Sequence, residues 1–140
     1  MQLVYIAGTF IATNMNKFIK ILKDNGCKLT NVRLSVLGIL ESEHGLLSAQ
    51  DIYQKLHFEF DLASVYRTLN LFQGLGIVFS EKVADREFFY LDTKPHHHIV
   101  CRKCGYNECV PCDHLNFSFK NFSNIAHSLT LSGVCKTCKF

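Results

Sequence analysis

The 140-residue sequence has no apolar run long enough to cross a membrane and no large surplus of charge of one sign. Residues 1–14 are apolar and uncharged, but they are shorter than the roughly 20 residues of a membrane-spanning helix and lack the basic start of a signal peptide. The net charge is +3, and residues 15–92 hold nine Lys/Arg against ten Asp/Glu. Bulk charge therefore does not indicate a nucleic-acid-binding protein, and any contact with DNA must come from one local face.

No secretory signal accompanies the seven cysteines. Secreted proteins tend to pair their cysteines, so this odd number fits a reducing compartment better, and we expect a cytoplasmic protein with most thiols on metal. We expect residues 1–14 to be a tail or an over-extended start of the reading frame. A strand or arm packed on the body is the alternative.

Two Cys-x-x-Cys pairs dominate the C-terminal third. They are Cys101 with Cys104 and Cys135 with Cys138, separated by 30 residues. Four thiolates at this spacing are typical of a closed tetrahedral zinc site, whose Zn–S bonds replace part of the core that a small domain lacks. A disulfide pair or a redox Cys-x-x-Cys is the alternative, but the first pair lacks the strand-to-helix context of a thioredoxin-like site. The pattern predicts structural zinc.

Three consecutive histidines stand just before the first cysteine pair. In an extended segment side chains alternate between faces, so His96 and His98 point one way and His97 the other. Histidine is the commonest metal ligand, so we predict a metal at His96 or His98. A solvated strand start rich in histidine is the alternative.

The N-terminal half predicts helices followed by a β-hairpin. Thr30 and Asp61 are suitable N-caps, and Ser48 with Asp51 resembles a capping box with Asp in place of Glu. The expected helices cover residues 16–25, about 31–40, about 49–56 and 62–73, and the expected strands cover residues 77–83 and 87–92. This order is that of a winged helix-turn-helix.

Residues 62–73 are the helix that we expect to contact DNA. Its buried stripe consists of Leu62, Val65, Leu69 and Phe72. Its other side carries polar groups and one aromatic ring able to reach phosphates and bases, namely Ser64, Tyr66, Arg67 and Asn70. The alternative is an ordinary surface helix with a polar face.

The C-terminal part predicts a small β-α-β module. Residues 106–110 are expected to pair as a strand with residues 98–101, a helix is expected from about 114 to 125, and a last strand at 127–131. Such a module leaves an apolar sheet edge, and self-association across that edge is the expected outcome.

Three stretches of the sequence resemble the ferric uptake regulator family. Residues 61–70, DLASVYRTLN, resemble its recognition helix, and residues 96–105, HHHIVCRKCG, resemble its signature between hinge and dimerisation domain. The closing pattern from His127 to Cys138 fits as well, so the resemblance covers Lys17 to Cys138 in the expected order. It implies an α+β fold with a winged-helix domain at residues 15–92 and a zinc-stapled α/β dimerisation domain at residues 93–140.

The resemblance also implies a function. It indicates a homodimeric, metal-responsive repressor that binds double-stranded DNA at an AT-rich palindromic operator. Tyr66 and Arg67 would contact DNA, and the two cysteine pairs would hold structural zinc. His96 and His98 match the regulatory site in the hinge, while His97 and His127 match an additional site near the dimer core.

Three positions depart from the family pattern. Tyr90 stands where a carboxylate is usual, with Asp92 the nearest acid, and Leu46 stands where a histidine is usual, with His44 two residues away. Cys109 stands where another acid is usual, beside Glu108. The regulatory ligands of the iron type are therefore incomplete.

These departures bear on the metal that is sensed. Thiolates select zinc or Cu(I) over Fe²⁺ and Mn²⁺, so Cys109 beside His96 and His98, with Glu108 adjacent, favours a zinc-responsive regulator. An iron-responsive or peroxide-sensing regulator is the alternative. Cys112 and His114, with His44, are further metal-ligand candidates. Against this, Cys109 and Cys112 could be inert or redox-active thiols.

Other classes of protein carry less weight. A zinc hydrolase or thiol enzyme would need a positioned base, and none is apparent beyond Glu108, while His-x-x-Glu motifs are absent. We therefore expect no enzyme. A zinc-stabilised interaction module whose winged helix does not bind DNA is the third reading.

Overall fold

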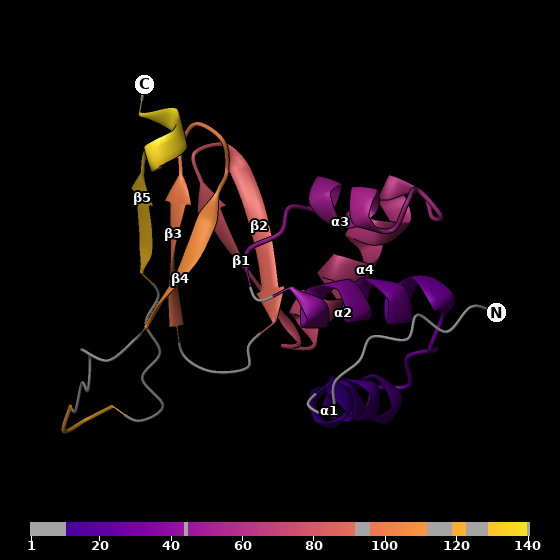
Figure 1. Ribbon diagram of the computed structural model, residues 1–140. Helices are drawn as coiled ribbons and strands as arrows, with labels where there is room; N and C mark the ends of the chain where they lie inside the picture. Colours follow the sequence, from indigo (N-terminus) through magenta and orange to yellow (C-terminus); the bar gives the residue numbers. More distant parts are fainter. Residues whose placement is uncertain (1–10, 44, 92–95, 112–118, 123–128, 140) are drawn as a thin grey trace.

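A computed structural model describes residues 11–43, 45–91, 96–111, 119–122 and 129–139. In these residues four helices come first and five strands follow, so the fold is α+β, as predicted (Figure 1). The helices are α1 (Ile11–Asp24), α2 (Asn31–Ser42), α3 (Ala49–Lys55) and α4 (Leu62–Gly74). The strands are β1 (Val78–Val83), β2 (Arg86–Leu91), β3 (His96–Cys101), β4 (Asn107–Pro111) and β5 (Thr130–Gly133), with a 3-10 turn η1 (Lys136–Cys138) after them.

The predicted capping signals begin two of the helices. Ser48 and Asp51 form a reciprocal capping box at the start of α3. Asp61 accepts a hydrogen bond from the Ser64 amide at the start of α4, at 2.8 Å. Thr30 occupies the N-cap position of α2 but makes no side-chain cap bond. The local sequence therefore sets where α3 and α4 begin.

The first helix begins at Ile11 and not at residue 16, while the over-extended start of the reading frame stays a prediction. Residues 11–14 contain no Gly or Pro, and the Met15 side chain packs against the main core. Nothing in this local sequence stops the helix at residue 16. Residues 1–10 lie outside the described part of the chain.

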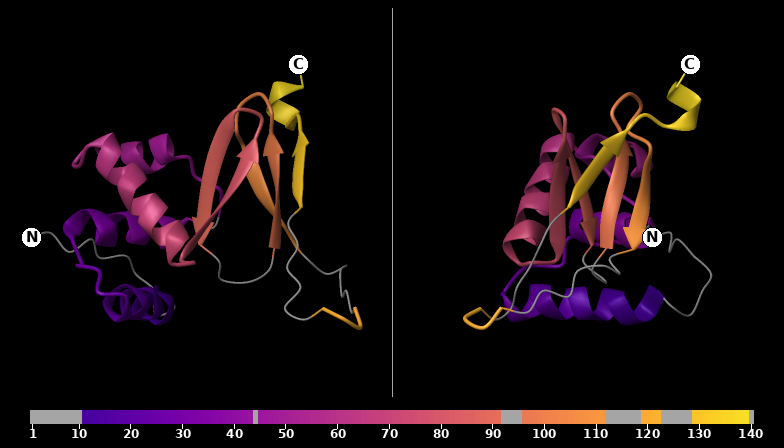
Figure 2. Two further views of the ribbon diagram at one scale, coloured as in Figure 1. Left: turned by 180° about the vertical axis from the view of Figure 1, so that it is seen from behind. Right: turned by 90° about the vertical axis from the view of Figure 1, so that its left-hand side faces the viewer.

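The hairpin of β1 and β2 is buried on both faces. Its strands pair antiparallel in the register that sets Glu81 opposite Phe88, and Ala84 turns the chain with φ of 54°. On one face Phe89 joins the main core beneath the helices, while on the other Phe88 joins a second cluster that includes Val100 of β3. The hairpin lies between the helices and the second sheet in both views (Figure 2).

The C-terminal sheet has the order β4-β3-β5. The strand β3 pairs antiparallel with β4, as predicted, and parallel with β5. The helix predicted for residues 114–125 is not seen where the structure describes that stretch, because residues 119–122 form a turn closed by the Phe122 amide on the Phe119 carbonyl. Asn, Ser and Phe fill this segment, and all three have modest helix propensity. Its other residues lie outside the described part.

Direct contacts join the helical part to the C-terminal sheet. The buried side chain of Leu46, in the α2–α3 connection, packs with Val83, Phe88 and Val100. The Asn107 side chain of β4 hydrogen-bonds both backbone polar groups of Leu46. The next residue, Leu47, exchanges two backbone hydrogen bonds with Phe89 of β2. The connection before α3 is therefore fixed from both sides.

Candidate metal centres and nucleic-acid interface

The four predicted zinc ligands come together at one end of the C-terminal sheet. Cys101 ends β3, Cys104 follows in the turn, and Cys135 and Cys138 flank the turn η1. Their sulfur atoms all lie within 4.8 Å of one another. In the described part of the chain this is the only group of three or more His, Cys, Asp or Glu at such spacing. Gly105, with φ of 78°, allows the sharp turn after the first pair.

The spacing of these sulfurs fits a metal ion. The Sγ atoms of Cys104 and Cys135 lie 3.7 Å apart. Two sulfurs bound to zinc at about 2.3 Å, at the tetrahedral angle, would lie about 3.8 Å apart. The backbone also helps, because the Cys135 amide donates to Cys101 Sγ at 3.3 Å. The cluster can therefore hold a metal without a large rearrangement of the chain.

The thiol pKa values differ across the cluster. The Cys135 amide, with that of Cys104, lowers the pKa of Cys101 to about 6. Hydrogen bonds with the Cys104 and Cys135 sulfurs raise the pKa of Cys138 to about 12. Sulfurs packed this closely resist ionising together unless a cation balances the charge. A bound divalent ion would supply that charge, so the donor chemistry agrees with the distances.

A second group of polar residues lies at the joint between the hairpin and the C-terminal sheet. The His98 ring is fully buried, and its Nδ1 lies 3.2 Å from Oε1 of Glu81, whose side chain is only 8% exposed. The Tyr90 ring packs edge-on against the imidazole, with centroids 4.8 Å apart. The sequence reading predicted His98 but not Glu81. Glu81 has no motif spacing to the histidines, and only the packing of the β1–β2 hairpin against the C-terminal sheet brings it there.

The strand register decides which neighbours share a face with His98. Cys109 is directly opposite His98 on β4, so the two side chains project to the same face. Glu108 is opposite Ile99 and therefore faces the other way, where its carboxylate accepts from the Tyr106 hydroxyl at 2.7 Å. The structure thus brings Cys109 to His98 and does not bring Glu108 there, because side chains alternate along a strand. Cys109 is exposed, and partial desolvation raises the pKa of its thiol.

The other predicted ligands are placed less completely. His97 is buried on the face opposite to His98, across from Val110. His96 begins β3 opposite Pro111, but its side chain lies outside the described part. The remaining candidates lie entirely outside the described residues, and they are His44, Cys112, His114 and His127.

The predicted DNA-contacting residues lie on the exposed side of α4. Tyr66, Arg67 and Asn70 are exposed, while Val65, Leu69 and Phe72 are buried as expected. Thr68, which was not predicted, is buried too, and Leu62 is only half-buried. The Arg67 guanidinium donates to the Ser64 hydroxyl at 2.9 Å, and Ser64 donates to Asp61 at 2.7 Å. This chain of bonds holds the guanidinium along the first turn of the helix.

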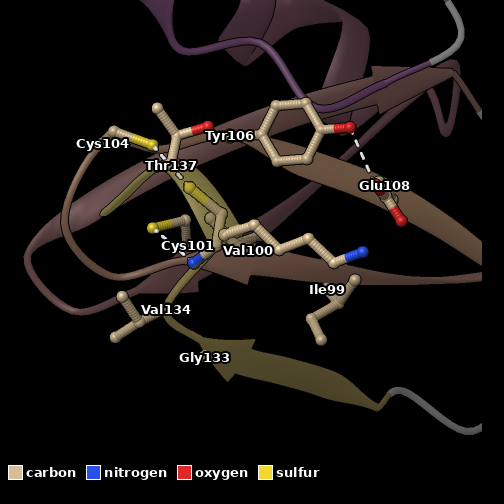
Figure 3. Close-up of a pocket in the computed structure, with 11 residues that line it drawn as sticks. Ile99, Val100, Cys101, Cys104, Tyr106, Glu108, Gly133, Val134 and Thr137 are labelled. Atoms are coloured by element: carbon tan, nitrogen blue, oxygen red, sulfur yellow. Dashed lines mark hydrogen bonds between the residues drawn. The ribbon is translucent and has the colours of Figure 1, made fainter. Parts of the chain in front are cut away.

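An apolar hollow of about 560 Å³ adjoins the cysteine cluster. Figure 3 shows Ile99 and Val134 on one side of it and Tyr106, hydrogen-bonded to Glu108, on the other. These three apolar side chains are exposed in the single chain. The surface adjoins the strand edges at which the sequence predicts self-association.

Comparison with known proteins decides the family. The profile of the Ferric uptake regulator family matches residues 24–127. The chain belongs to the ferric uptake regulator family. A ferric uptake regulation protein of Staphylococcus epidermidis is 34% identical over 134 residues, which are 90% of this chain and 97% of the relative.

Solved structures of the ferric uptake regulator family agree with the fold. The ferric uptake regulator of Vibrio cholerae superposes with a TM-score of 0.67 at 33% identity, covering 83% of this chain and 98% of its own. The Helicobacter pylori regulator, described as having three functional metal-binding sites, superposes with a TM-score of 0.72 at 19% identity, covering 100% of this chain and 98% of its own.

Family membership confirms several predictions. Ferric uptake regulators are metal-responsive transcription regulators that bind DNA as dimers, and they are not enzymes. The N-terminal helices with the β1–β2 hairpin are therefore a winged helix-turn-helix, and the small sheet with its four cysteines is the second part of the α+β fold. Among the described helices, none is long and apolar enough to cross a membrane.

Proposed function

We propose that this chain is a zinc-responsive repressor of metal-uptake genes, acting in the cytoplasm as a homodimer on an AT-rich palindromic operator. The observation that carries the zinc assignment is the register that sets Cys109 opposite His98. A thiolate next to an imidazole favours zinc over Fe²⁺ or Mn²⁺. The cysteine cluster would hold a separate, structural zinc.

The location of His98 explains how metal would act on DNA binding. His98 belongs to the C-terminal sheet, while Glu81 and Tyr90, which contact it, belong to the hairpin that packs on the helices of the winged helix. A cation held at this joint fixes the angle between the two parts. Two recognition helices in a dimer must match successive major grooves, so a fixed angle favours DNA binding.

The DNA contacts would come from α4. Arg67, Tyr66 and Asn70 are exposed on one side of the helix, where a guanidinium and an amide can reach base edges. Ser64 would position Arg67 through their hydrogen bond. The homodimer would form through the apolar surface at Ile99, Tyr106 and Val134, which closes the exposed side of the sheet.

Ferrous iron is the second candidate for the sensed metal. The Glu81 carboxylate beside His98 gives a nitrogen and oxygen donor pair, which suits Fe²⁺ as well as Zn²⁺. The Staphylococcus epidermidis relative is also named for ferric uptake. The thiol of Cys109 is the feature that separates the two candidates.

The test replaces that thiol. In protein that keeps its structural zinc, Cys109→Ser should weaken activation of DNA binding by Zn²⁺ at least tenfold in metal concentration, while Cys27→Ser, distant in the sequence from both cysteine pairs, should leave it unchanged. Unaltered zinc activation in Cys109→Ser, with activation by anaerobic Fe²⁺ in both proteins, would favour the iron regulator.

A further inference from the structure

We infer that Glu81 is the carboxylate ligand of the hinge metal, in place of the carboxylate that the family resemblance leads us to expect at position 90. This inference rests on the proposed function, because it names a ligand of the same regulatory site. Tyr90 occupies the usual position of the carboxylate on β2. In this chain the acid is supplied by the neighbouring strand.

The hairpin register shows how one residue can substitute for the other. Glu81 is paired with Phe88 and Tyr90 with Phe79, so Glu81 and Tyr90 are diagonal neighbours on the same face of the hairpin. Diagonal neighbours on a sheet lie about 7–8 Å apart, within reach of long side chains. A Glu at position 81 can therefore reach the point that a carboxylate at position 90 would reach.

The contacts of Glu81 lead to the same conclusion. Its Oε1 lies 3.2 Å from Nδ1 of the buried His98, and its Oε2 accepts from the Thr130 hydroxyl at 3.3 Å. The carboxylate, which belongs to β1, thus contacts two further strands, β3 and β5. Burying a carboxylate is costly unless it is paired with a charge or a metal, so this placement is expected of a group with an ionic partner.

The distance between the two donor atoms suits a shared ion. A separation of 3.2 Å is an ordinary hydrogen bond, but it is also near the roughly 3.3 Å between two ligand atoms bound to zinc at about 2.0–2.1 Å with tetrahedral angles. Cys109, opposite His98 on the same face, adds a third donor type. The Glu81 and His98 donors are already at the spacing of a shared ion, whereas the Cys109 sulfur has to move toward them to complete the site.

Glu81 as a ligand would also couple metal binding at the hinge to the position of the DNA-binding helix. Glu81 belongs to the hairpin strand that packs against α4, and His98 belongs to the C-terminal sheet. An ion bound by both residues ties the recognition helix to the dimerising part through a single strand.

The experiment measures metal binding and not DNA binding. Protein with its structural zinc retained is titrated with Co²⁺, whose visible spectrum reports coordination, and the hinge affinity for Zn²⁺ is then obtained by competition. Glu81→Gln should weaken binding at this second site at least tenfold and change the cobalt bands. Glu108→Gln is the matched control, since Glu108 adjoins Cys109 but faces away from His98, and it should bind as the wild type does.

Each result has a distinct meaning. A wild-type protein that binds no second metal ion refutes the proposed function itself. Wild-type affinity and spectrum in Glu81→Gln, with a second ion bound, refute the Glu81 ligand and leave the hinge site standing. If Glu81→Gln loses its structural zinc or its fold, Glu81→Asp tests instead whether Glu81 binds the hinge metal. Its retracted carboxylate is expected to bind several-fold more weakly, and wild-type affinity there would overturn the inference.

Discussion

The Asn107 side chain holds both backbone polar groups of Leu46. Its Oδ1 accepts from the Leu46 amide at 2.9 Å, and its Nδ2 donates to the Leu46 carbonyl at 3.1 Å and to the Gly105 carbonyl at 3.3 Å. Leu46 stands where the family resemblance leads us to expect a histidine ligand. At this point an amide and an apolar cluster join the two parts of the chain without needing a metal.

Replacing Asn107 should therefore weaken the joint. In Asn107→Ala the partly buried amide and carbonyl of Leu46 lose their partner, and a buried polar group left unsatisfied costs about 1–3 kcal/mol. Urea unfolding of the zinc-containing protein measures the change. Asn70→Ala, on the exposed face of α4, is the control and should stay within about 0.5 kcal/mol of the wild type. Equal stability of the two variants would show that the amide contributes nothing to the joint.

Gly45 should be sensitive for the same reason. A Cβ at this position would lie 2.8 Å from Asn107 Oδ1, so Gly45→Ala must displace an amide that makes three hydrogen bonds. We expect Gly45→Ala to destabilise the wild type but to have little effect in the Asn107→Ala background. The double-mutant cycle measures this coupling. Additive effects would mean that Gly45 is required for another reason.

The cysteine cluster should be needed for folding of the C-terminal sheet. Cys104→Ser removes one of four sulfurs at metal-binding distance, so we expect loss of the bound zinc and of the cooperative unfolding transition of this part. Zinc content by atomic absorption, together with near-ultraviolet circular dichroism, measures both. Cys27→Ser is the control, because Cys27 belongs to neither cysteine pair, and this variant should keep one structural zinc per chain. Retention of zinc and cooperativity in Cys104→Ser would contradict a structural role.

Arg67 should carry sequence-specific affinity for DNA. Loss of a guanidinium that contacts a base costs about 1–3 kcal/mol, and loss of a phosphate contact lowers the salt dependence by about one unit of slope. We expect Arg67→Ala to weaken operator binding by about 1–3 kcal/mol. We expect Arg67→Lys to keep the salt dependence of binding but to lose discrimination between operators. Fluorescence anisotropy at several salt concentrations distinguishes these effects. Lys20→Ala, on α1, is the control. If it weakens operator binding as much as Arg67→Ala does, the affinity depends only on the overall charge of the protein.

Local signals predicted most of the elements but not the joint. The Ser48 and Asp61 caps marked α3 and α4, and the pairing of β3 with β4 followed from alternation next to a cysteine turn. Glu81 and Asn107 were missed because each acts on a residue distant in sequence and belongs to no spaced motif. Glu108 was grouped with Cys109 by adjacency, whereas in a strand adjacent residues face opposite ways.

The most direct test of zinc-dependent DNA binding is a fluorescence-anisotropy titration of the wild-type protein with its structural zinc retained. Promoter DNA from a zinc-transport gene and from an iron-transport gene is titrated while free Zn²⁺, or anaerobic Fe²⁺, is buffered at fixed levels. We expect tight, salt-sensitive binding that low free Zn²⁺ switches on and Fe²⁺ does not. Binding switched on by Fe²⁺ alone, or binding that ignores both metals, would contradict this expectation.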